Sequence, residues 1–335
     1  MDGEIEPVRL RPGAGIEILD QTLLPAEERY VILSDVPGVC EAIRSLRVRG
    51  APLLGIVGAA GMAVAGDCTD ASDAELARAA REIDATRPTA VELGAAASQA
   101  LAVACGAGTS PEVRRAALWG HAAAMLEARR REDREIGRLG AAVLPAGSSV
   151  LTHCNTGALA TGGIGTALGV IRTAWEQGRL ARCFATETRP LLQGARLTMW
   201  ELARLGLPAS LVPDTASASL IASGKVQAII TGADRIAANG DTANKVGTYG
   251  LAAVAARHGV PFYIAAPTTT FDPACARGPA IPIEFRGNEE VGGFGGVRWS
   301  PPGTDAYNPA FDVTPGELVA AIVREDGLFR PPYAF

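Results

Sequence analysis

The clearest structural signal in the chain is the segment Val150-Leu151-Thr152-His153-Cys154-Asn155-Thr156-Gly157. Its apolar first residues predict a strand over 149–152, which is followed at once by a thiol and then by a Gly-containing turn that leads into a predicted helix. Because a helix N-terminus favours an anion, a thiol at this place is expected to form a thiolate readily. Cys154 is therefore the first candidate for chemistry.

A second apolar run, Val226 to Thr231, is followed by Gly232-Ala233-Asp234-Arg235. A carboxyl group here occupies the position that the thiol holds after the first strand. Open α/β sheets build their sites at the carboxyl ends of strands. We therefore expect Cys154 and Asp234 to face one crevice as a base and an acid.

From residue 147 onward, short apolar runs alternate with helical patterns. Alternation of this kind predicts an α/β domain with a parallel sheet covered by helices. A last helix is expected to follow the segment 308–315 and to run through Val323. The predicted strands are 150–152, 183–185, 210–212, 226–231 and 261–265, and the predicted helices are 160–177, 190–205, 215–223 and 247–258.

The first third of the chain has a different pattern and predicts a smaller, mostly helical α+β domain. We place the domains at 1–126 and 127–335. The charged run 127–138 is expected to be a solvated helix face that joins them. The expected strands are 16–20 and 30–33, and the expected helices are 39–47, 51–65, 73–85, 90–105 and 111–139.

Composition limits the class of protein. The chain has 335 residues, is 48% hydrophobic and carries a net charge of −5, which disfavours a nucleic-acid or membrane surface as partner. Its acidic start argues against a signal peptide, and the apolar run 51–65 is shorter than the roughly 20 residues that span a bilayer. A cytoplasmic protein is expected.

Several familiar motifs are missing or incomplete. The six cysteines form no C-x-x-C pair, and His121 and His258 are isolated, so neither a disulfide framework nor a metal site is expected. The run Gly162-Gly163-Ile164-Gly165 lacks the G-x-G-x-x-G spacing because Leu168 takes the third glycine position, which disfavours a nicotinamide oxidoreductase. We expect no cofactor. His153 is expected to be a packed histidine rather than the partner of Cys154, since neighbours along a strand point to opposite faces.

Other motifs are candidates for binding a polar substrate. Arg49-Gly50-Ala51-Pro52 precedes a helix and is either an anion site or an ordinary helix start. The chain has two lysines, Lys225 and Lys245, and the second lies in a polar Gly-rich loop where an ammonium can hold a phosphate. Arg87 and Gln193 are candidate ligands for an anion or a sugar hydroxyl, and each also fits an ordinary helix start.

These motifs, in this order, resemble the 5-methylthioribose-1-phosphate isomerases of methionine salvage. The resemblance covers nearly the whole chain. It extends to the regulatory subunits of the exchange factor for eukaryotic translation initiation factor two, which bind rather than catalyse. The motifs that carry it are 19–25, Arg49 to Pro52, 86–91, His153 to Gly157, Glu187 to Gly194, Gly232 to Gly250 and Asn308 to Pro315.

The resemblance implies a small N-terminal domain on a Rossmann-like C-terminal domain, a homodimer, and a sugar 1-phosphate as substrate. It implies that Cys154 and Asp234 are the catalytic pair. It assigns substrate contacts to Arg49, Gly50, Ala51, Arg87, Gln193, Asn244 and Lys245. To stay protonated near pH 7 and act as an acid, Asp234 would need a raised pKa, which desolvation in an apolar crevice can provide.

The chain also departs from the family pattern. The run Glu92 to Ala96 replaces an Asn and bulky aromatics, Thr186 stands in place of a common Asp, and Phe285 in place of an acidic residue. These changes leave the catalytic pair intact but alter residues expected near the 5-substituent of the sugar. A 5-deoxyribose 1-phosphate or another 5-modified sugar is therefore an alternative substrate, and a non-catalytic metabolite-binding regulator is a further alternative.

Overall fold

The computed structural model describes residues 5–87 and 90–335. The chain contacts divide it into two compact units. Unit 1 extends to Asp133 and includes Gly157–Gly165, and unit 2 comprises Arg134–Thr156 and Thr166–Phe335. The division therefore falls later than the expected 126/127, inside a long helix, and unit 1 also takes in a segment from far along the chain.

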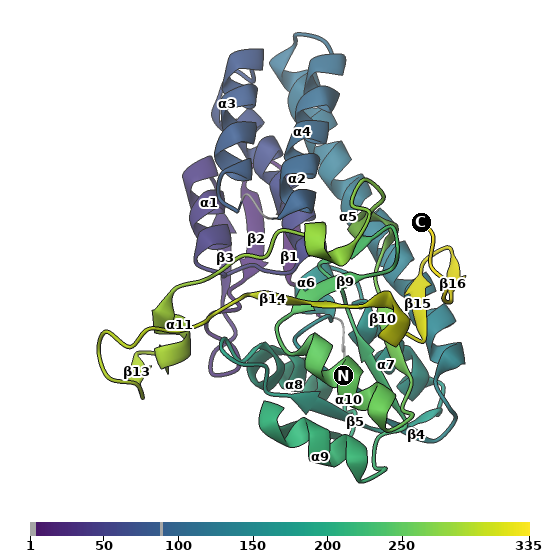
Figure 1. The fold of residues 1–335 in the computed structure, drawn as a ribbon. Coiled ribbons are helices and arrows are strands. Elements are labelled where there is room, and N and C mark those ends of the chain that lie inside the picture. Colours follow the sequence, from purple (N-terminus) through teal and green to yellow (C-terminus); the bar gives the residue numbers. More distant parts are fainter. Residues whose placement is uncertain (1–4, 88–89) are drawn as a thin grey trace. The chain divides into compact units, whose positions relative to one another are not determined.

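Unit 1 combines a small antiparallel sheet with a group of helices (Figure 1). Its central helix is buried almost throughout from Leu53 to Gly66. This helix has the length and apolarity of a membrane span, but 78% of it is buried inside the protein. The elements of unit 1 are β1 (Val8–Arg11), β2 (Gly15–Leu19), β3 (Tyr30–Leu33), α1 (Val36–Arg44), α2 (Ala51–Cys68), α3 (Asp73–Asp84), α4 (Val91–Gly106), the first part of α5 (Pro111–Val143) and α6 (Ala158–Thr161).

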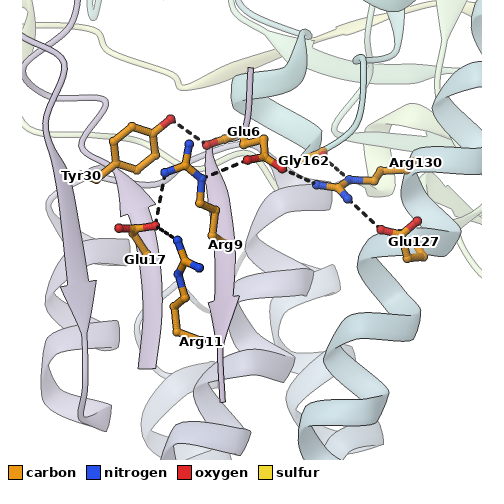
Figure 2. A network of polar contacts seen from close by, with 8 residues as sticks. All are labelled: Glu6, Arg9, Arg11, Glu17, Tyr30, Glu127, Arg130 and Gly162. Carbon is orange, nitrogen blue, oxygen red and sulfur yellow. Dashed lines mark hydrogen bonds and ion pairs between the residues drawn. The ribbon is translucent and has the colours of Figure 1, made fainter. Parts of the chain in front are cut away.

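An ion-pair network ties the sheet of unit 1 to α5 (Figure 2). Arg9 on β1 pairs with Glu17 on β2 at 3.3 Å and with Glu6 at 3.0 Å. Arg130 on α5 then pairs with Glu6 at 3.4 Å and with Glu127 at 2.8 Å. Surface ion pairs of this kind each contribute little, so the network fixes geometry more than it adds stability.

The charged run 127–138 is not entirely the solvated face that the sequence predicts. Asp133 within it is fully buried, where its Oδ2 accepts hydrogen bonds from the Thr161 hydroxyl at 2.5 Å and from the Gly165 N–H at 2.9 Å. Burial raises the pKa of Asp133 to about 6, and the nearby Arg129 only partly opposes this. Asp133 is therefore the most deeply buried charged side chain of α5, ahead of Arg114 and Arg129, which are 5% and 7% exposed.

Unit 2 is built on a seven-stranded sheet in the order β16-β15-β10-β7-β4-β5-β6, parallel except for β16 at one edge. The predicted α/β class and parallel sheet are confirmed. The strands are β4 (Ser148–Thr152), β5 (Leu180–Thr186), β6 (Ala209–Val212), β7 (Ala228–Thr231), β10 (Phe262–Ala265), β15 (Ala321–Arg324) and β16 (Gly327–Phe329).

Helices cover both faces of this sheet, and alternate strand residues feed two cores. Val150, Ala228 and Ile230 pack with α7, α8 and the end of α5, whereas Leu151 and Ile229 pack with α9 and α10. The helices are α7 (Ala167–Glu176), a π-helical turn η1 (Gly194–Thr198) that continues into α8 (Met199–Arg204), α9 (Ser217–Ala222) and α10 (Thr248–Arg257), with 3₁₀ turns at Asp214–Ala216, Thr268–Thr270, Gly278–Ala280 and Gly316–Leu318.

A second, four-stranded sheet in unit 2 has the order β11-β8-β9-β14. Its strands are too short to predict from the sequence. The helix expected after 308–315 and through Val323 is wrong, since that part of the chain forms a 3₁₀ turn (Gly316–Leu318) and then β15, whose Ala321, Ile322 and Val323 are buried. The elements are β8 (Arg235–Ala237), β9 (Thr242–Lys245), β11 (Phe271–Asp272) and β14 (Phe311–Thr314), beside α11 (Asn288–Gly292) and the hairpin β12 (Gly293–Phe294) and β13 (Val297–Arg298).

Candidate active site

The loops that carry Cys154 and Asp234 follow two neighbouring parallel strands. Strands β4 and β7 are parallel and pair in a register that places Leu151 beside Ile229, so both loops follow the carboxyl ends of their strands on the same side of the sheet. The loops also pack together, because a Cβ atom on Gly232 would lie 2.7 Å from the Thr156 side chain. The expected placement of the thiol and the carboxyl group at one sheet edge is confirmed by this register.

Asp234 lies beside Asn244 in the backbone of the second sheet. The Asp234 N–H donates to the Ala243 carbonyl at 2.9 Å, and β8 pairs antiparallel with β9 from the next residue on. Asn244 is buried, and its amide donates to the Thr248 hydroxyl at 3.0 Å. The second sheet thus places the backbone of Asp234 beside the strand that carries Asn244.

Asp234 itself is exposed. The sequence led us to expect an apolar crevice that desolvates this carboxyl group, and in the free protein that expectation is wrong. Desolvation would have to come from a bound substrate.

Lys245 is the last residue of β9, and only 9% of it is exposed. Its ammonium donates to the Ala310 carbonyl at 2.9 Å and lies 4.9 Å from the centre of the Phe311 ring. A cation held in this way is largely desolvated, which strengthens its attraction to an anion. The geometry suits an ammonium that binds a phosphate or a polarised hydroxyl.

Gln193 presents a buried acceptor that lacks a partner. The residue is 7% exposed, and its Oε1 accepts no hydrogen bond from the described parts of the chain. A buried acceptor left unsatisfied costs about 1–3 kcal/mol, so such a group is often reserved for a ligand. The predicted role of Gln193 as a ligand for a sugar hydroxyl is consistent with this arrangement.

The backbone of Cys154 is held in a strained conformation by two threonine hydroxyls. Its φ of 63° lies in the left-handed region. The Cys154 N–H donates to Thr188 Oγ1 at 2.9 Å, and the Cys154 carbonyl accepts from the Thr198 hydroxyl at 2.6 Å. The next residue, Asn155, donates to the buried carboxylate of Glu201 at 2.7 Å.

The single helix predicted over 160–177 is divided in the structure into α6 (Ala158–Thr161) and α7 (Ala167–Glu176). Helix α6 begins at Ala158 and lasts four residues, too few for a strong dipole. The hydroxyl contacts therefore replace the helix as the local support of the cysteine. Sequence reasoning did not single out Thr188, Thr198 or Glu201, and only the motif 187–194 drew attention to the first of them.

His153 is packed as expected, and both of its ring nitrogens are bonded. Nδ1 lies 2.6 Å from Thr186 Oγ1, and Nε2 lies 2.9 Å from the Val246 carbonyl. Burial lowers the pKa of His153, which favours the neutral ring. A pocket of about 370 Å³ borders His153, Thr186 and Asp214, and none of the predicted site residues lines it.

The remaining predicted residues belong to unit 1. Gly50 precedes α2 with a φ of 99°, and a Cβ atom there would overlap the Ala160 carbonyl, so only glycine fits. Arg49, Ala51 and Arg87 are each half-buried. The helix start predicted at Ala51 is confirmed, while Pro88 and Thr89 of the Thr-Arg-Pro-Thr motif lie outside the described residues.

A family model described as "Initiation factor 2 subunit family" matches residues 47–331. The chain belongs to this family.

Several similar proteins are named methylthioribose-1-phosphate isomerase. One from Anaeromyxobacter sp. (strain Fw109-5) is 50% identical over 95% of this chain and 92% of its own length. Another from Heliobacterium modesticaldum is 47% identical over 94% of this chain and 93% of its own. The resemblance found in the sequence is therefore confirmed.

Two solved structures that bear different names share the fold of this chain. The 5-methylthioribose 1-phosphate isomerase from Pyrococcus horikoshii OT3 is 38% identical with a TM-score of 0.92, over 98% of this chain and 94% of that chain. A protein described as translation initiation factor eIF-2B, subunit delta, from A. fulgidus is 39% identical with a TM-score of 0.88, over 98% of this chain and 97% of that chain.

Proposed function

We propose that this chain is an aldose–ketose isomerase that converts 5-methylthioribose 1-phosphate to 5-methylthioribulose 1-phosphate in methionine salvage. One observation carries the proposal. The chain shares 47–50% identity over nearly its whole length with proteins that bear this name. The position of Cys154 and Asp234 at the ends of two adjacent strands supports it.

The substrate sets two chemical tasks. Its C1 phosphate locks the sugar ring, so the ring oxygen must be protonated as its bond to C1 breaks. A hydrogen must then move from C2 to C1. We assign the first proton to Asp234, which must be protonated when the substrate is bound. Because Asp234 is exposed in the free protein, the bound sugar has to exclude the water that would favour its ionised form.

The hydrogen transfer can follow one of two balanced routes. In the first, the Cys154 thiolate takes the C2 proton and returns it to C1, while the Asp234 carboxylate takes the proton of the C2 hydroxyl as the new carbonyl forms. In the second, hydride passes directly from C2 to C1, and Asp234 takes the same hydroxyl proton. Both routes return Asp234 to its protonated form and produce the ketose.

The other assigned residues bind the substrate. Lys245 has the buried ammonium suited to the phosphate or to a hydroxyl next to it, and Gln193 and Asn244 offer amides to the sugar hydroxyls. From the resemblance we assign further substrate contacts to Arg49, Gly50, Ala51 and Arg87, whose guanidinium groups and helix-start backbone N–H groups suit a phosphate.

The test is proton NMR of the purified protein with 5-methylthioribose 1-phosphate in D₂O. We expect the ketose 1-phosphate to form, and Cys154→Ser to form it far more slowly. Deuterium at C1 of the product would indicate proton transfer through Cys154, and retention of hydrogen would indicate the hydride route. No conversion by the wild-type protein would reject the proposed function.

A parallel sample with 5-deoxyribose 1-phosphate addresses the alternative substrate. Faster conversion of the deoxy sugar would show that the changed run Glu92 to Ala96 accompanies a different 5-substituent. Binding of either sugar without conversion would favour a metabolite-binding regulator, the class suggested by the relative named as a translation initiation factor. The proposed setting is the cytoplasm. The proposed assembly is a homodimer, and light scattering of the purified protein would test this assembly.

A further inference from the structure

The side chain of His153 lies between two loops that hold proposed site residues. One ring nitrogen contacts Thr186 at the end of β5, and the other contacts the carbonyl of Val246, the residue that follows Lys245. A chain of hydrogen bonds continues from Thr186 through Thr188 to the N–H of Cys154. Four contacts of 2.6 to 3.0 Å therefore join the cysteine loop to the lysine loop.

The two ends of this hydrogen-bond chain determine which group donates and which accepts along it. The Val246 carbonyl can only accept, so His153 Nε2 carries a hydrogen and donates it. The Cys154 N–H can only donate, so Thr188 Oγ1 accepts from it. With a neutral ring, Nδ1 then accepts from the Thr186 hydroxyl. The Thr188 hydroxyl is therefore the donor toward Thr186, whose Oγ1 lies at 3.0 Å and whose backbone carbonyl lies at 3.3 Å.

One end of the hydrogen-bond chain is the peptide N–H of Cys154, and the backbone there needs support. Cys154 and Thr188 both have left-handed backbones, with φ of 63° and 64°, which costs each residue about 1 kcal/mol or more. Asp214 fixes the second of them, because its carboxylate accepts from the N–H groups of Thr188 at 2.9 Å and Arg189 at 2.6 Å. The Thr188 hydroxyl is thus held in place to receive the Cys154 N–H.

The other end of the hydrogen-bond chain, in the loop that follows Lys245, is packed just as closely. A Cβ atom on Gly247 would lie 3.1 Å from the His153 ring, and the glycine has a φ of 106°. The Gly247 N–H donates to Asp312 at 2.7 Å, and the Tyr249 N–H donates to the same carboxylate at 3.1 Å. The lysine loop is therefore held between Asp312 and His153.

We propose that His153 is a positioning residue that sets Cys154 and Lys245 relative to each other, through Thr186 and Thr188 on one side and the Val246 carbonyl on the other. It touches neither the substrate nor the reacting atoms. The proposal rests on the proposed function, since it uses the roles assigned there to Cys154 and Lys245.

Two substitutions of His153 separate its two contacts. His153→Asn keeps an acceptor near Nδ1 for Thr186 and loses the bond to Val246. His153→Gln keeps a donor near Nε2 for Val246 and loses the bond to Thr186. Since misplacement of a reacting group by about 1 Å can cost about 100-fold in rate, we expect His153→Gln to lower kcat roughly 10- to 100-fold with a smaller change in KM.

For His153→Asn we expect the opposite pattern, a KM raised about 5- to 10-fold with a smaller change in kcat, because one buried hydrogen bond contributes about 1 kcal/mol. His258→Gln, at an exposed histidine after α10, is the matched control and should change neither constant. A purely structural histidine would lower the active fraction of both His153 variants and leave KM unchanged. Changes in the same constant for both variants would overturn the proposal.

Thr188 supplies a second test that does not need the proposed substrate. In Thr188→Val the Cys154 N–H loses its acceptor, whereas Thr188→Ser keeps it. We expect iodoacetamide to alkylate Cys154, which is 6% exposed, about 5-fold faster in Thr188→Val than in the wild type, with Thr188→Ser close to the wild type. Mass spectrometry of the Cys154 peptide gives the rates.

The outcomes distinguish the two proposals. A wild-type protein that does not isomerise the sugar while Thr188→Val alone changes the alkylation rate would reject the proposed function and keep the positioning role of the chain. Equal alkylation rates in all three proteins, with kcat of Thr188→Val unchanged in an active enzyme, would reject the positioning role and keep the function.

Discussion

Gly194 lies so close to Thr186 that any Cβ atom on it would overlap the Thr186 carbonyl oxygen. The contact folds the segment after β5 back on the end of its own strand. Ala195 N–H completes the turn by donating to the Glu187 carbonyl at 3.2 Å. The close approach fixes the loop that carries Thr188 and Gln193, and it allows only glycine.

Gly194→Ala is therefore expected to displace this loop. Relief of the overlap needs a backbone shift, so we expect a loss of stability of about 1–3 kcal/mol and a loss of activity larger than the loss of folded protein. Gly120→Ala is the control, since Gly120 is exposed on α5 with open space around its Cα, and alanine there should add about 0.5–1 kcal/mol. Urea denaturation of both variants gives the free energies; equal stabilities would contradict the argument.

The sequence predicted five of the seven strands of the main sheet because they are short apolar runs separated by helical patterns of ordinary length, but it missed β15 and β16. The second sheet could not be predicted in this way. Strands such as β8 (Arg235–Ala237) have too few residues to show an alternation, and their pairing depends on contacts distant in sequence, such as β9 with β14. The same limit produced the wrong helix through Val323.

The candidate site was predictable where residue type and motif spacing carry the signal. Cys154 and Asp234 follow apolar runs, and the register of β4 and β7 brings their loops together. The hydroxyl supports were not predictable, since Thr198 acts on Cys154 from 44 residues away and a left-handed backbone at a cysteine has no sequence signature. Burial of Asp133 was missed for a related reason, because its partner Thr161 is 28 residues distant.

The unsatisfied Oε1 of Gln193 predicts opposite effects on stability and on binding. Gln193→Leu removes a buried acceptor that has no partner in the free protein, so the free energy of unfolding should stay constant or rise by about 1 kcal/mol. The KM for the sugar phosphate should rise about 10-fold, because a substrate hydroxyl loses its acceptor. Steady-state kinetics and thermal unfolding of the same preparation measure both.

Gln227 provides the matched control for this prediction. Its side chain accepts from the Ser149 N–H at 2.8 Å and donates to the Gly224 carbonyl at 2.8 Å, at the opposite end of β7 from the site. Gln227→Leu should lower the free energy of unfolding and leave KM unchanged. A Gln193→Leu protein that is destabilised like Gln227→Leu, with an unchanged KM, would show that Gln193 is only a structural residue.

Asp133 should make stability depend on pH in a defined window. Its pKa of about 6 in the folded protein lies above the value of about 3.8 for an unburied Asp, so the folded state binds this proton more tightly than the unfolded state does. The free energy of unfolding is therefore expected to fall as the pH rises from about 4 to about 6. The full loss above that range is about 3 kcal/mol.

Asp133→Asn removes the ionisation, so the effect can be isolated by subtraction. The difference in unfolding free energy, wild type minus Asp133→Asn, should decrease by about 3 kcal/mol between pH 4 and pH 7, while the other carboxylates cancel. Thr161→Val deletes the hydroxyl that donates to the ionised carboxylate, so in that background the decrease should move to higher pH. Chemical denaturation at half-unit pH steps measures both curves. A difference that stays flat across this range would mean that Asp133 is not desolvated in solution, and that Thr161 and Gly165 share it with water.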